Sequence, residues 1–175
     1  MLERLKSRGF AVVWAIVRIW LGVQWMKWGL EKFTAGGFDA TAFLNGAVRK
    51  SLGDFPSVPG WYASFLKGFA LPHVDFFNLL VSYGEVLVAI SLILGALTTV
   101  GLVAALLMNL SFMLAASTYP NPLLYSIAIV LLIMGPAAYE FGVDRYMLPI
   151  LKRILAQFRA RSPKRAPEAV PERTP

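Results

Sequence analysis

Three polar residues interrupt apolar stretches of this sequence and are the best candidates for chemistry: Arg18, Glu85 and Asn109. A charged side chain at the centre of a membrane helix costs about 2.5 to 3.5 kcal/mol on insertion scales, so it usually pairs or binds a ligand. Arg18 is expected about 12 Å outward from Phe10, and Glu85 about 14 Å inward from Phe76. Because an apolar bilayer core is about 30 Å thick, these depths predict that Arg18 and Glu85 face each other.

A buried pair of this kind allows two roles, which the sequence leaves open. An ion pair can fix the register of packed helices, although polar contacts between membrane helices average only about 0.6 kcal/mol. Alternatively, Arg18 and Glu85 bind a ligand or move protons, and they are then the candidate catalytic residues. Asn109 is expected at a similar depth in a third apolar stretch and joins them as a candidate ligand-binding residue.

A second set of polar side chains is predicted nearer the outer surface of the same bundle. Its members are Gln24, Lys27, Glu31, Lys32, Asn78, Tyr119, Asn121 and Tyr125, and the candidate ligand-binding residues among them are Lys27, Lys32, Asn78, Tyr119 and Tyr125. These side chains could bind the oxygens of a ligand, but snorkelling lysines and interfacial tyrosines are also ordinary in membrane proteins. No metal site is expected, because the chain has no cysteine and only one histidine.

The elements that position these residues follow from the apolar content of the chain. Hydrophobic residues make up 57% of the sequence, and the mean hydropathy is +0.61, whereas soluble domains average about 45–50% apolar residues. The apolar residues form four blocks of near membrane-spanning length, at 10–30, 76–94, 99–118 and 123–139. The sequence therefore predicts an all-α polytopic membrane protein with a four-transmembrane-helix bundle over residues 10–149.

The net charge of +7 is placed in a way that predicts topology rather than binding to nucleic acid. Basic residues cluster in the N-terminal segment 1–9 and after the last span, whereas the connection at 34–74 is nearly neutral. Because cytoplasmic segments of membrane proteins are enriched in lysine and arginine, both termini are expected in the cytoplasm. The expected location is a plasma membrane of bacterial or archaeal type.

Three segments outside the spans are expected to differ in structure. Residues 34–74 are too few for a domain and should form an external cap, with helices at 40–52, capped by Asp39, and at 61–69. Residues 150–161 read as a basic amphipathic helix for an anionic inner leaflet. The Pro-rich, charged tail at 162–175 is expected to be disordered.

Three short motifs are shared with a known family. They comprise Arg18, Ile19, Leu21, Gly22, Gly29, Lys32 and Phe33, then Gly84, Glu85, Leu92–Gly95, Leu97 and Thr98, and finally Gly142, Asp144 and Arg145. In this order the motifs resemble the DoxX/DoxD family of small four-helix membrane proteins, over about Ala11 to Pro149. The long first external loop looks more like the DoxD branch, the membrane subunit associated with thiosulfate:quinone oxidoreductase.

The resemblance implies a quinone-linked oxidoreductase, with electrons drawn from thiosulfate or another small reductant. The chain offers no cofactor ligands of its own, so a bound quinone or a redox partner subunit would carry the electrons. The alternative is a non-enzymatic membrane scaffold for a redox or stress-response partner. A small-molecule or lipid transporter ranks third, because the sequence shows no inverted repeat. Whether the chain is an enzyme, and its oligomeric state, stay open.

The predicted topology can be tested with single cysteines, since the chain has none of its own. An impermeant thiol reagent applied to intact cells should label Ser57→Cys in the external cap and spare Ser162→Cys in the cytoplasmic tail. Labelling after cell lysis is the control that both thiols can react. Labelling of Ser162→Cys in intact cells would contradict the topology.

Overall fold

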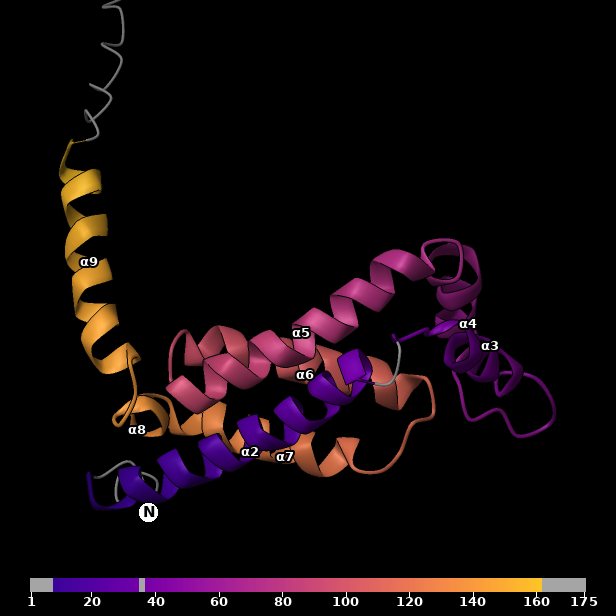
Figure 1. Cartoon of the computed structure of the whole chain (residues 1–175), viewed down its shortest axis with the longest axis horizontal. Helices are drawn as coiled ribbons and strands as arrows, with labels where there is room; N and C mark the ends of the chain where they lie inside the picture. The colour runs from indigo at the N-terminus through magenta and orange to yellow at the C-terminus, as the bar shows by residue number, and fades with distance from the viewer. Residues whose placement is uncertain (1–7, 35–36, 162–175) are drawn as a thin grey trace, which may run out of the picture.

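The computed structural model describes residues 8–34 and 37–161, and within these ranges all regular structure is helical (Figure 1). The longest bundle helices are α2 (Arg8–Thr34) and α5 (Val74–Leu94), and they pack beside α6 (Thr98–Leu114) and α7 (Asn121–Met134). The chain continues through the short α8 (Pro136–Tyr139) into α9 (Asp144–Arg161), which leaves the bundle at one end.

Two of the described helices are long and apolar enough to cross a membrane, over Gly9–Thr34 and Val74–Leu94. The other two predicted spans coincide with apolar helices that are shorter, because α6 has 17 residues and α7 has 14. At Ala116 the backbone adopts a positive φ of 57°, just beyond the end of α6. The fold shown is therefore an all-α protein with two candidate membrane-spanning helices.

Two glycines set the close packing of α2 against α5. A Cβ atom at Gly22 would lie 2.9 Å from Cγ1 of Ile93, and one at Gly29 would lie 2.8 Å from Cγ2 of Val86. Both values are too short for a side chain to fit without movement, so the two helices approach more closely here than larger residues would allow. This contact places Gly29 against Glu85 and Gly22 against Ala89 and Ile93.

The same register shows that the predicted pairing of Arg18 with Glu85 is wrong. Arg18 lies against Gly95, just after the end of α5, whereas Glu85 lies against Gly29. Gly29 is eleven residues further along α2 than Arg18, or about 16 Å at 1.5 Å per residue. The predicted depth of Arg18 assumed that both helices end at one level, but α2 extends beyond the end of α5 and also contacts α8.

Arg18 instead belongs to a structure that we call the Arg18 junction, formed with Gly95, Phe141, Gly142 and Asp144. Its guanidinium is 1% exposed and donates a hydrogen bond from Nη2 to the carbonyl oxygen of Phe141 at 3.1 Å. Nη1 lies where a Cβ atom at Gly95 or Gly142 would be, so both positions require glycine. The junction thus joins α2 to two distant segments of the chain.

Backbone and side-chain hydrogen bonds complete the Arg18 junction. The amide of Asp144 donates to the carbonyl oxygen of Gly95 at 2.8 Å, and the Asp144 carboxylate accepts from the amides of Leu97 and Thr98 at 2.7 Å each. Because these amides begin α6, the buried carboxylate caps that helix and complements its dipole. The start of α9, the α5–α6 turn and α2 are therefore held as one unit.

The cap consists of α3 (Thr41–Arg49), α4 (Gly60–Phe65) and the π-helical turn η1 (Leu66–Ala70), at the end of the bundle opposite α9 (Figure 1). It has its own cluster of buried residues, including Leu44, Val58 and Leu66. The hydroxyl of Tyr62 donates to the carbonyl oxygen of Ser111 at 2.9 Å, which fixes the cap to α6.

One local prediction is confirmed and two need correction. α7 ends before Gly135, where φ is +55°. The helix predicted at 40–52 spans Thr41–Arg49, and its N-cap is Ala40 rather than Asp39. Asp39 Oδ1 still accepts hydrogen bonds from the hydroxyl and amide of Thr41, which lower the pKa of Asp39. The amphipathic helix predicted from residue 150 begins already at Asp144 and includes Pro149 within it. Residues 1–7 and the predicted tail at 162–175 lie outside the described residues.

The α2–α5 contact can be tested by enlarging one of its glycines. Gly22→Ala should lower the free energy of unfolding by about 1–3 kcal/mol, because the added methyl group overpacks the contact with Ala89 and Ile93. Gly46→Ala is the matched control, since Gly46 is also helical but a methyl group added there would meet no atom within 4 Å. Equal melting temperatures in detergent for both variants would contradict the close contact.

Candidate functional site

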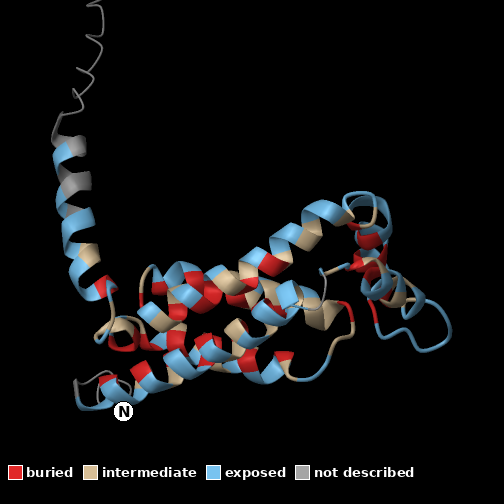
Figure 2. Cartoon of the chain, in the orientation of Figure 1, coloured by how far each residue is buried: buried red, intermediate tan, exposed pale blue. Residues whose placement is uncertain are grey.

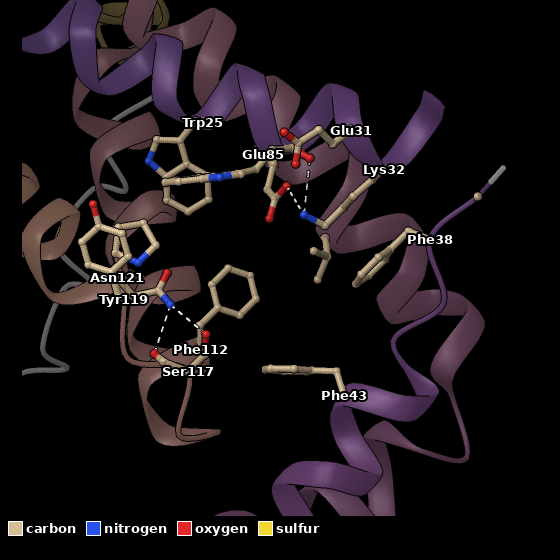
Figure 3. Close-up of a pocket in the computed structure, with 14 residues that line it drawn as sticks. Trp25, Glu31, Lys32, Phe38, Phe43, Glu85, Phe112, Ser117, Tyr119 and Asn121 are labelled. Atoms are coloured by element: carbon tan, nitrogen blue, oxygen red, sulfur yellow. Dashed lines mark hydrogen bonds and ion pairs between the residues drawn. The ribbon is translucent and has the colours of Figure 1, made fainter. Parts of the chain in front are cut away.

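A cavity of about 430 Å³ lies where α2 and α5 meet the cap and the α6–α7 turn (Figure 3). Its walls are largely aromatic and are formed by Trp25, Trp28, Phe38, Phe43, Phe112 and Tyr119. Its polar groups are those of Glu31, Lys32, Glu85, Ser117 and Asn121. We refer to this space as the α2–α5 cavity.

The strongest polar interaction in the cavity is an ion pair between Lys32 on α2 and Glu85 on α5. The Lys32 Nζ atom lies 2.5 Å from Glu85 Oε2, and the side chains are 17% and 3% exposed. The ammonium group also lies 5.1 Å from the centre of the Phe38 ring, within the range of a cation–π interaction. A charge-assisted hydrogen bond in such a sheltered place is stronger than one on the surface.

The position of this pair follows from the glycine contact between the helices. Glu85 reaches the cavity because α5 packs against Gly29, which brings the Cβ atom of Glu85 close to α2. Lys32 is three residues beyond Gly29 and so is on the same face of α2. In Figure 3 both side chains extend toward the space bounded by Phe112 and Phe43.

A buried donor in the cavity wall has no partner within the described chain. The indole of Trp25 is 1% exposed, lines the cavity, and its Nε1 atom forms no hydrogen bond with any described residue. The amide of Asn109, buried in α6, likewise has no partner among the residues described. Unpaired buried groups are rare in native proteins and are often completed by a water or a ligand.

The structure brings together only part of the predicted ligand set. Lys32, Glu85 and Tyr119 line the α2–α5 cavity, although the Tyr119 ring is 86% exposed and lies at its rim. The other five predicted residues do not line it: Arg18, Lys27, Asn78, Asn109 and Tyr125.

These five residues have other surroundings. Lys27 is exposed on α2, and Tyr125 is half-buried on α7. The Asn78 side chain accepts a hydrogen bond from the amide of Ala40 at 2.8 Å, so it attaches the cap to α5. Arg18 is in the Arg18 junction, at the opposite end of the α2–α5 contact from Lys32.

Several lining residues were not predicted as site residues. Phe38 and Phe43 come from the cap, whose position over α2 and α5 has no local signal in the sequence. Asn121 was predicted in the outer polar set but not among its ligand-binding residues; its Nδ2 atom donates to the carbonyl oxygen and the hydroxyl of Ser117, both at 3.1 Å. Phe112 lies one helical turn beyond Asn109 on α6. The helical repeat from Asn109 was therefore the only feature of the sequence that could have placed Phe112 on the same face.

Comparisons with protein-family models, with curated proteins and with solved structures found no match for this chain. The site is accordingly defined by its own geometry, as an aromatic cavity in a helical bundle where an ammonium group of Lys32 meets the carboxylate of Glu85. Among the motif residues named above, Lys32 and Glu85 line the cavity and Gly29 lies against Glu85, whereas Arg18, Gly95, Gly142 and Asp144 form the Arg18 junction.

The Lys32–Glu85 pair can be tested with a double-mutant cycle. Glu85→Leu should cost about 3 kcal/mol of unfolding free energy, the low end for a broken buried pair because Lys32 is partly exposed, and Lys32→Met alone should also destabilise the protein. The double variant Lys32→Met with Glu85→Leu should recover much of this loss, measured by thermal melts in detergent. Lys27→Met, an exposed lysine on the same helix, is the control. Strictly additive single effects would contradict the pair.

Proposed function

We propose that this chain is the integral membrane subunit of a quinone-linked oxidoreductase and that the α2–α5 cavity binds the quinone headgroup. The observation that carries the proposal is the Lys32–Glu85 ion pair, held in a cavity with aromatic walls and a volume of about 430 Å³. A space of this size suits a small ring system with a few well-placed polar partners.

The membrane setting proposed for this function has four spans, with the cap outside and both termini in the cytoplasm. The two candidate spans α2 and α5 support it directly. α6 would be about 25 Å long, near the lower limit for a thin bilayer, whereas α7, at about 21 Å, would need its continuation α8 or local thinning of the bilayer to complete the span. The cap and the basic helix α9 lie at opposite ends of the bundle, as this orientation requires (Figure 1).

The cavity residues match what reduction of a quinone demands of a protein. A bound quinone would take up two electrons and two protons, with negative charge developing on its oxygens. The Lys32 ammonium can donate a hydrogen bond to such an oxygen and stabilise that charge. The Glu85 carboxylate, adjacent to Lys32 and sheltered from solvent, can accept and deliver a proton.

The aromatic walls would orient the ring and keep water away from it. Trp28, Phe38 and Phe112 present flat apolar surfaces to the cavity, and offset or edge-on packing on such rings is favourable. The electrons would come from thiosulfate or another small reductant, directly or through a redox partner subunit. This donor is proposed from the family resemblance alone.

The test measures quinone binding to the purified protein. Binding is detected as quenching of the tryptophan fluorescence, because Trp25 and Trp28 line the cavity. With a short-chain benzoquinone, Lys32→Met and Glu85→Gln should each weaken binding by about 10- to 100-fold, the loss expected for one charged hydrogen bond. Lys27→Met is the matched control and should bind as the wild type does, because Lys27 does not line the cavity.

Each variant must elute from a sizing column as the wild type does before its binding is interpreted. Equal quinone affinity of the wild type and both cavity variants would show that the headgroup does not bind in the α2–α5 cavity. Absence of binding to the wild type, together with no isoprenoid quinone in a solvent extract of the protein, would favour the non-enzymatic scaffold instead.

A further inference from the structure

A second and larger hollow of about 800 Å³ runs between α5 and α6, and we call it the α5–α6 groove. Among its lining residues are Leu80, Gly84 and Leu87 on α5 and Ala104, Leu107 and Met108 on α6. On α6 its lining extends from Val100 to Phe112, a length of about 18 Å at 1.5 Å per residue. The groove therefore extends along most of the two helices.

The groove opens because the cap separates the outer ends of α5 and α6. At the inner end the two helices are joined by the tight turn at Gly95. At the outer end the cap binds α5 through Asn78 and α6 through Ser111. Figure 1 shows α5 rising toward α4 while α6 stays beside α7, and Figure 2 shows few buried residues on the outer half of α5.

The chemistry of the groove is apolar throughout its described lining. No charged side chain lines it among the described residues. Its hydroxyl groups already donate to backbone carbonyl oxygens: Ser91 to Ala96 at 2.7 Å, Ser111 to Leu107 at 2.9 Å, and Tyr62 to Ser111 at 2.9 Å. A polar molecule would lose its hydration here without gaining partners, whereas a hydrocarbon chain would not.

The groove adjoins the α2–α5 cavity, and this position indicates what kind of molecule fits it. Four residues line both spaces: Phe38, Phe43, Val81 and Phe112. A molecule with its polar ring beside Lys32 and Glu85 could thus extend an apolar tail past Val81 into the groove. Such a shape is that of an amphiphile with one planar head and one long hydrocarbon tail.

We infer that the α5–α6 groove holds the isoprenoid tail of the quinone whose headgroup occupies the α2–α5 cavity. This inference rests on the proposed function and adds to it a separate binding site for the tail of the quinone. Because the tail would exchange lipid for the groove, the groove would hold it by van der Waals packing along the two helices. The tail would also hold the headgroup in the orientation that the cavity requires.

The test compares two quinones with one headgroup, a tailless benzoquinone and its decyl derivative, on variants of adjacent α6 residues. Ala104→Phe narrows the groove, whereas Val103→Phe adds a ring of the same kind at an exposed position that does not line it. Wild type and Val103→Phe should bind the decyl quinone at least 10-fold more tightly than the tailless one. Ala104→Phe should bind the decyl quinone about 10-fold more weakly than the wild type does. It should bind the tailless quinone with unchanged affinity.

A second variant guards against a folding defect in the first. Gly84→Leu enters the same groove from α5, where a Cβ atom would meet the Met108 side chain at an ordinary distance of 3.5 Å. It should show the same selective loss, with an unchanged elution profile. Comparison among variants at one detergent concentration cancels the partitioning of the decyl quinone into micelles.

The outcomes separate this inference from the function on which it rests. If the tailless quinone binds but both groove variants bind the decyl quinone as the wild type does, the groove inference is overturned and the headgroup site stands. If neither quinone binds the wild type, both are overturned. The purified protein could also carry one bound phospholipid per chain that the decyl quinone does not displace. In that case the groove would hold a lipid chain, and the inference would be overturned.

Discussion

The close approach of α2 and α5 at Gly22 and Gly29 is the constraint on which the rest of the structure depends. Neither position leaves room for a side chain, so the two helices can meet in only one register at this distance. That register decides which polar groups face each other across the contact. It brings Glu85 to Lys32 at one end and Arg18 to Gly95 at the other.

The two ends of this contact show the two roles that a buried charge can have. Around Arg18 the chain is densely packed, with a guanidinium lying on Gly95 and Gly142 and a carboxylate capping the next helix. Arg18 therefore acts as a structural connector between α2 and the segments near α9. Around Lys32 and Glu85 there is open space with aromatic walls, which is the setting of a binding site.

The cap contributes to the α2–α5 cavity as well as covering the end of the bundle. Phe38 and Phe43 line both the α2–α5 cavity and the α5–α6 groove, so the cap forms the wall that the two spaces share. Hydrogen bonds from the cap to Asn78 and Ser111 keep α5 and α6 apart at their outer ends. Movement of the cap would change the size of both spaces together.

The sequence by itself determined the all-α fold, the approximate helix positions and the break before Pro136. These features depend on helical periodicity and on local backbone chemistry, which residues near one another in the chain dictate. It also identified Arg18, Lys32 and Glu85 as residues of interest, since charged groups are rare in apolar helices.

Only the tertiary structure decided which of these residues meet. Depth counted from a helix end does not fix which residues of two helices lie side by side, because helices of unequal length need not end at one level. Arg18 and Gly29 are eleven residues apart on α2. Because of this separation, Glu85 lies beside Gly29 and not beside Arg18, which lies against Gly95 instead. The register and the cap position depend on contacts between residues far apart in the chain, and no local pattern of the sequence encodes such contacts.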